Sequence, residues 1–111
     1  MELQEIKKLK PYPIVCLCGS TKFKSDFLSW AKKLTLQGYI VTMPMIFGHA
    51  GDTITDEQKI NLDKLHKAKI ENADIVFIIN TNGYIGESTR NEINFAKALN
   101  KYILYTEVPE E

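Results

Sequence analysis

The chain has 111 residues, which is enough for one domain and too few for two. Its 14 Lys+Arg balance its 14 Asp+Glu, and this zero net charge argues against a general nucleic-acid binder and against electrostatic attachment to anionic lipid. The balance of 44% hydrophobic and 25% charged residues is that of a globular domain. No apolar run reaches the ~18 residues that span a bilayer, and the charged start predicts no signal peptide, so we expect a cytoplasmic protein.

The first half of the chain predicts two strands around one helix. Residues 1–10 are polar and predict at most a loose helical turn, which the prolines that follow would end. The continuous apolar run 14–18 predicts a strand that is covered on both faces, as in a parallel sheet. Residues 21–37 carry apolar residues at helical spacing, with Gly38 as the stop, and 39–43 predict the second strand. The expected core side chains of this helix are Phe23, Phe27, Trp30, Ala31 and Leu34.

The second half alternates in the same way. After a loop over 44–54, Thr55 and Gln58 form a capping-box pattern that predicts a helix to about Asn72. Strands are predicted over 75–79 and 102–105. Between them lie a loop over 80–86 and a helix over 89–99, and Asn100 would end this helix. Residues 106–111 form an acidic tail. The inner stripe of the first of these helices and its edge are expected to be formed by Leu62, Leu65, Lys69 and Ile70. The apolar residues of the second are Ile93, Phe95, Ala96 and Leu99.

Strands that alternate with helices predict a Rossmann-like (flavodoxin-like) α/β sandwich, a single domain over 1–111 with its core at about 13–106. Right-handed crossovers predict a four-stranded parallel sheet in the order 2-1-3-4 with helices on both faces. Ligands of such sheets bind beyond the carboxyl ends of the strands, where the winding reverses. Three segments reach that edge: 19–22, 44–54 and 80–89.

The segment Gly19-Ser20-Thr21-Lys22 follows the first strand and opens a helix. A close-approaching glycine, two hydroxyls, free helix N–H groups and a lysine suit a phosphate or carboxylate. The segment is neither a Walker A motif nor a three-glycine dinucleotide fingerprint. The alternative is that Ser20 or Thr21 only caps the helix, with Lys22 in solvent.

The loop after the third strand holds two glycines, two hydroxyls, two carboxylates and the only arginine of the chain. Thr89 and Glu92 match a capping box, so Glu92 has a local structural explanation. The functional alternative places Glu92 in the first helical turn, facing the cleft as a nucleophile for a sugar carbon. The candidate binding residues here are Gly86, Ser88, Thr89 and Arg90, and Tyr84 and Glu87 are possible accessories.

Other polar residues have ordinary structural explanations. His49 and Asp52 lie in a glycine-containing loop, where His49 is either solvated or a proton shuttle. His66 is expected to be a half-buried packing residue of its helix, with a role as a site accessory as the alternative, and Asp74 a turn residue at the amino edge of the sheet. Cys16 and Cys18 predict buried, reduced thiols, because residues two apart on a strand are poorly placed for a disulfide. No second cysteine pair or histidine cluster completes a zinc site, so we expect no metal and no cofactor.

The order and spacing of these motifs resemble the nucleoside 2-deoxyribosyltransferase superfamily, which includes 2'-deoxynucleoside 5'-phosphate N-hydrolases. The resemblance covers about residues 14–106. It rests on four motifs. Two of them are Cys18-Gly19-Ser20, which is followed by the basic residue Lys22, and residues 73–76 at the start of the third strand. The other two are the loop that leads to Glu92-Ile93 and residues 98–103, which lead into the last strand.

The resemblance implies N-glycosidic chemistry on a deoxynucleoside or its 5'-monophosphate. Glu92 matches the nucleophilic glutamate, which attacks C1' of the sugar through an oxocarbenium-like transition state. Ser20 and Lys22 match the anion-binding loop, while Ser88 and Thr89 lie where a phosphate or ribose hydroxyl is held. Arg90 is a weaker candidate for the anion, and His49 or Glu87 for assisting the base. Relatives often carry a tyrosine at the position of Cys16, and Tyr84 would supply the hydroxyl that is missing there. The phosphohydrolases have an aspartate at the position of His66.

The implied partners are a small-molecule nucleoside or nucleotide and a second copy of the chain, in a homodimer or higher homo-oligomer. No polymeric nucleic acid or membrane is expected. Two alternatives remain open: a non-catalytic nucleotide-sensing module of the same fold, and a structural domain in which Glu92 is only a cap.

Overall fold

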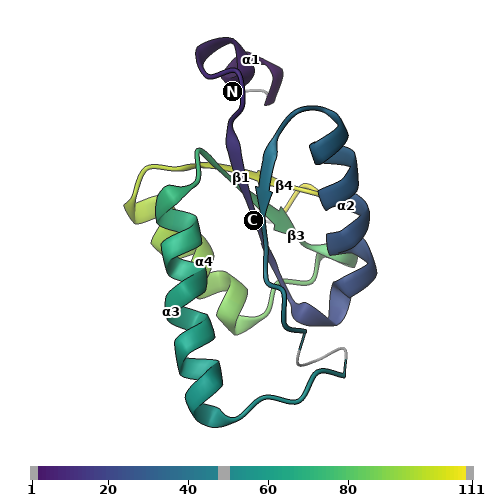
Figure 1. The fold of residues 1–111 in the computed structure, drawn as a ribbon, viewed down its shortest axis with the longest axis vertical. Coiled ribbons are helices and arrows are strands. Elements are labelled where there is room, and N and C mark those ends of the chain that lie inside the picture. Colours follow the sequence, from purple (N-terminus) through teal and green to yellow (C-terminus); the bar gives the residue numbers. More distant parts are fainter. Residues whose placement is uncertain (1–2, 48–50, 110–111) are drawn as a thin grey trace.

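Four parallel strands form one sheet in the order β2-β1-β3-β4, as predicted, in a computed structural model that describes residues 3–47 and 51–109 (Figure 1). The central pair, β1 and β3, is in register from Val15 beside Ile75 to Gly19 beside Ile79. The strands are β1 (Ile14–Gly19), β2 (Ile40–Thr42), β3 (Ile75–Ile79) and β4 (Tyr102–Tyr105). The helices are α1 (Leu3–Leu9), α2 (Lys24–Leu36), α3 (Asp56–Asn72) and α4 (Glu87–Ala98), with 3-10 turns η1 (Thr21–Phe23) and η3 (Thr81–Gly83).

The helices cover both faces of the sheet, with α2 on one side and α3 and α4 on the other (Figure 1). Because side chains alternate along a strand, the residues of β1 divide between two cores. Val15 and Leu17 pack with Phe27 and Leu34 of α2. Cys16 and Cys18 face the opposite side, in the core that includes Ile70 of α3 and residues of α4. This double coverage explains why β1 and β3 are apolar without alternation.

Local signals set several helix ends as predicted. At the start of α3, the Thr55 hydroxyl accepts the Gln58 amide at 3.1 Å, and the Gln58 side chain accepts the Thr55 amide at 2.9 Å. Gly38, with φ of 90°, follows the end of α2, and Asn100, with φ of 57°, follows the end of α4. The capping box and the left-handed stop residues are therefore confirmed.

The fold differs from the prediction at four places. Residues Leu3–Leu9 form a helix, because Ile6 packs into the core beside α2. The helix α4 begins at Glu87, two residues before the predicted start, with Gly86 as its N-cap. The predicted helix over 21–37 opens with the 3-10 turn η1, so that α2 begins at Lys24, and β2 begins at Ile40 rather than at residue 39.

Asn80 connects the carboxyl edge of the sheet to the C-terminal segment through side-chain hydrogen bonds. Its side chain is fully buried at the end of β3. Its amide nitrogen donates to the Glu107 carbonyl at 2.8 Å, and its amide oxygen accepts the Thr106 hydroxyl and the Glu107 amide, each at 2.9 Å. These bonds hold the start of the segment 80–86, which leads to α4.

Candidate functional site

A cavity of about 650 Å³ lies at the carboxyl edge of the sheet, where the winding reverses between β1 and β3. This is the size range of small-molecule sites. Residues from all three predicted segments line it, together with one face of α3. The lining residues used below are Gly19, Ser20, Thr21, Met45, Ile46, Ile54, Lys59, Leu62, Asp63, Leu65, His66, Lys69, Tyr84, Gly86, Glu87, Ser88, Thr89 and Glu92.

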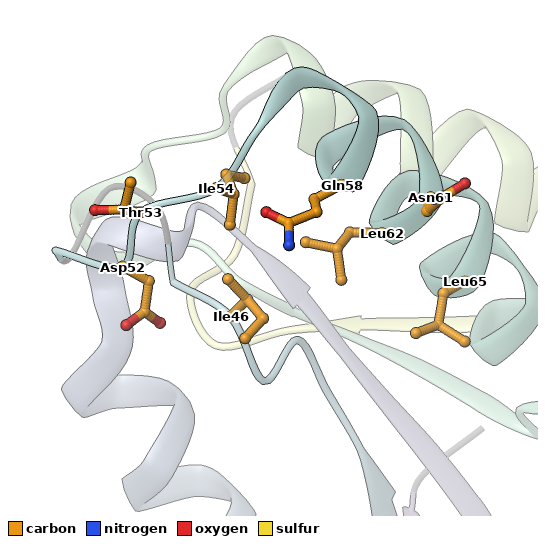
Figure 2. Close-up of a pocket in the computed structure, with 8 residues that line it drawn as sticks. All are labelled: Ile46, Asp52, Thr53, Ile54, Gln58, Asn61, Leu62 and Leu65. Carbon is orange, nitrogen blue, oxygen red and sulfur yellow. The ribbon is translucent and has the colours of Figure 1, made fainter.

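An apolar side pocket of about 360 Å³ adjoins this cavity and shares Ile46, Ile54, Leu62 and Leu65 with it. Figure 2 shows these side chains between the segment after β2 and the first turns of α3, with the Gln58 amide directed between them. Leu65, which was predicted for the inner stripe of α3 or its edge, is 52% exposed and forms part of this wall. An apolar wall with a few amides suits a flat aromatic group.

The turn after β1 approaches β3 so closely that only glycine fits at position 19. Gly19 has φ of 155°, and a Cβ there would lie 2.6 Å from the Ile79 carbonyl oxygen. The next residue, Ser20, caps η1, and its hydroxyl accepts the Lys22 amide at 3.4 Å. The structure therefore gives Ser20 the capping role that was one of its two predicted explanations, while Gly19, Ser20 and Thr21 all line the cavity.

Glu92 is not a capping residue. Since α4 begins after Gly86, Thr89 is its third residue and is buried, and Glu92 lies in the second turn rather than the first. The Glu92 side chain lines the cavity and is 23% exposed. Burial, and then the nearby charge of Asp63, raise the pKa of Glu92 to about 7, against a smaller opposing effect of Lys59. The local explanation for Glu92 is therefore wrong.

His66 lies beside Glu92, with its Nε2 3.5 Å from Oε2 of the carboxyl. Burial, and then the charge of Lys69, lower the pKa of His66 to about 4, so the imidazole is neutral near pH 7 and this contact is not an ion pair. Among the described residues, Nδ1 of His66 is buried without a hydrogen-bond partner. Because an unpaired buried N–H is costly, we place the ring proton on Nε2, facing Glu92 and Cys18. His66 was predicted as a packing residue, and it is buried, but it also belongs to the cavity wall.

Both cysteines are free thiols and are fully buried, as predicted. They form a hydrogen-bonded pair, which lowers the pKa of Cys16 and raises the pKa of Cys18 well above its ordinary value, an increase to which burial adds. Sγ of Cys18 lies 3.2 Å from Nε2 of His66. The thiols thus lie directly behind the Glu92–His66 pair, as seen from the cavity.

The two predicted cations do not line the cavity. Lys22 is exposed, and its ammonium lies 3.4 Å from the centroid of the Tyr84 ring. The Tyr84 ring also packs edge-on against the ring of Phe23. Arg90 is exposed on α4. Tyr84, a predicted accessory, does line the cavity. The cavity lysines are instead Lys59 and Lys69, which the sequence analysis did not select as site residues; Lys69 donates to the Met43 carbonyl at 2.8 Å.

The remaining candidates divide as follows. Glu87 and Ser88 are exposed at the cavity rim, in the first turn of α4. His49 lies outside the described residues. Asp52 accepts the Phe47 amide at 2.7 Å within its own loop and contributes to the side pocket. Asp74 is at the opposite edge, where it accepts the Ile14 amide at 2.8 Å and pairs with Lys10, as its predicted turn role requires.

No protein-family model matches the chain, and no curated protein sequence matches it. Within residues 3–47 and 51–109, no helix is both long and apolar enough to cross a membrane.

Proposed function

We propose that the protein cleaves or transfers the N-glycosidic bond of a deoxynucleoside or its 5'-monophosphate, with Glu92 as the nucleophile. The observation that carries this proposal is the position of Glu92: a carboxyl on the cavity wall, largely buried, that makes no cap for its own helix. The motif resemblance to nucleoside 2-deoxyribosyltransferases assigns the nucleophile to the same residue.

The cavity has a suitable place for each part of the substrate. The sugar would lie over Glu92, the base would enter the apolar side pocket between Ile46 and Leu62, and a 5'-phosphate would meet the first turn of α4. Gly86 provides no side-chain cap, so the first amides of α4 have no side-chain partner there. Free helix amides and the positive end of the helix dipole favour an anion.

In the proposed reaction, an ionised Glu92 oxygen forms a bond to C1' as the C1'–N bond breaks. The base leaves with the bonding electron pair and takes a proton from water at the open rim. Water, or the nitrogen of a second base, then displaces Glu92 from C1', which completes hydrolysis or transfer. His66 holds the carboxyl from behind through its neutral ring.

The experiment is to incubate the protein with the natural deoxynucleosides and their 5'-monophosphates, with and without a second base, and to measure free or exchanged base by chromatography. We expect Glu92→Gln to lower the rate by at least about a thousandfold, as loss of a nucleophile does. Acid-quenched wild-type protein should carry a sugar adduct in its intact mass, and the variant should not.

Glu71→Gln is the matched control, because Glu71 is an exposed carboxylate of α3 outside the cavity lining. Equal background rates in wild type, Glu92→Gln and Glu71→Gln with every substrate would refute the enzymatic proposal. A nucleotide that raises the melting temperature but stays intact would identify a sensing module instead.

A further inference from the structure

Three potential metal ligands of different chemistry meet behind the cavity wall. Cys16 and Cys18 point to the same face of β1 because they are two residues apart on a strand. α3 packs against that face and brings His66 to it, with Nε2 3.2 Å from Sγ of Cys18. The two sulfurs and a ring nitrogen of His66 all lie within 4.8 Å of one another.

This donor set matches one class of cation. Thiolates and an imidazole favour Zn²⁺ and related divalent ions and disfavour Mg²⁺ and Ca²⁺, which take oxygen ligands. Bonds of about 2.3 Å to sulfur and about 2.0 Å to nitrogen around a tetrahedral ion put the ligand atoms roughly 3.5–3.8 Å apart. Sγ of Cys18 and Nε2 of His66 lie 3.2 Å apart, and all three ligand atoms lie within 4.8 Å of one another, so shifts of about 1 Å or less would bring them to this separation.

The fourth position faces the cavity. Oε2 of Glu92 lies 3.5 Å from Nε2 of His66, on the side where both residues line the cavity. A cation can therefore enter from solvent through the cavity. The Glu92 carboxyl lies beside His66 but outside the cluster of three ligand atoms, so water from the cavity would complete a four-coordinate shell. An ordinary pair of buried structural cysteines would have neither the histidine nor this opening.

We propose that Cys16, Cys18 and His66 form a binding site for a zinc-class divalent cation, with water from the cavity as the fourth ligand. On binding, the two thiol protons leave to the buffer, the His66 ring proton moves from Nε2 to Nδ1 so that Nε2 can bind the ion, and the two thiolates neutralise the charge of the ion. The proposal does not rest on the proposed function.

The test uses the untagged full-length chain, reduced and freed of metal by a chelator that is then removed. Titration with Co²⁺ should produce a thiolate-to-cobalt charge-transfer absorption that saturates at one ion per chain. Added Zn²⁺ should displace Co²⁺ and so remove this absorption band. Competition with a chromophoric chelator should give the zinc affinity. Zn²⁺ should also raise the melting temperature of the wild-type chain.

Three variants test the ligands, and two further variants serve as controls. Cys16→Ser, Cys18→Ser and His66→Gln should each weaken zinc binding by roughly 100-fold or more, because even loss of an outer-shell partner costs 10- to 100-fold. His49→Gln, which changes the only other histidine, should leave the affinity unchanged. Glu92→Gln should keep the charge-transfer band, since both thiolates remain.

Thermal unfolding of each metal-free variant shows whether it folds. If a serine variant does not fold, Cys16→Ala or Cys18→Ala replaces it in the binding assay. A folded wild-type chain that gives no charge-transfer band would overturn the proposal. Binding that survives both cysteine changes, or that is lost in His49→Gln alone, would overturn it as well, because the ion would then lie elsewhere. Base release by the metal-free chain tests the enzymatic proposal separately.

Discussion

Asn80→Ala tests whether the C-terminal segment secures the edge of the sheet that carries the cavity. The substitution removes three hydrogen bonds of 2.8–2.9 Å from a fully buried side chain. At about 1 kcal/mol for each neutral bond, the loss is about 3 kcal/mol. Water can reach the freed groups of Glu107, which is exposed, so we expect a measured loss of about 2–3 kcal/mol.

Equilibrium unfolding in urea, followed by circular dichroism, measures this loss. At roughly 4–8 °C per kcal/mol for a domain of about this size, the melting temperature should fall by about 10–20 °C. Asn94→Ala is the matched control, since Asn94 is an exposed residue of α4, and it should change stability by less than about 0.5 kcal/mol. If Asn80→Ala costs no more than Asn94→Ala, the hydrogen-bonded link between β3 and the C-terminal segment does not carry the stability assigned to it.

Three further changes test other parts of the fold. Gly19→Ala should destabilise the chain by roughly 2–4 kcal/mol in the same unfolding assay, because its Cβ would meet the Ile79 carbonyl at 2.6 Å; a neutral result would contradict this backbone approach. Thr55→Ala should cost about 1 kcal/mol through loss of the cap of α3, and a cost equal to that of an exposed threonine elsewhere would argue against the capping box. Asp74→Asn tests a pH effect: burial alone would raise the pKa of Asp74, but the Ile14 amide and Lys10 outweigh it and hold the pKa below 3.8. Because the pKa of Asp74 is lower in the folded state, its carboxylate contributes stability that is present above pH 3.8 and is lost as the pH falls below that value. The difference in unfolding free energy between wild type and Asp74→Asn should therefore shrink below about pH 4. A difference that stays constant with pH would refute this reasoning.

The strand order and most element bounds follow from the sequence because they depend on local patterns. Continuous apolar runs predicted strands covered on both faces, and right-handed crossovers, with helices on both faces, favoured the parallel order 2-1-3-4. The capping box at Thr55 and the left-handed residues Gly38 and Asn100 ended their helices where local chemistry indicated. These signals act over a few residues, so no knowledge of distant contacts was needed.

The Thr89–Glu92 pattern failed for the opposite reason. It is a valid capping box in isolation, but α4 starts at Glu87 because the chain enters it from a segment held by Asn80 and by the packing around Tyr84. Those partners lie outside any local window. The shift of two residues turns Glu92 from a cap into a group of the cavity wall.

By itself, the sequence determined the α/β sandwich and the strand order, and it predicted the sheet edge at which the cavity lies and Glu92 as a candidate carboxyl there. Only the tertiary structure decided what surrounds that carboxyl. His66 lies 48 residues beyond Cys18 in the chain, yet the packing of α3 on β1 brings the two within 3.2 Å, while Lys22 turns to the ring of Tyr84 instead of the cavity. Periodicity assigns a residue to a face of its own element, but which neighbour meets that face depends on how the helices pack on the sheet.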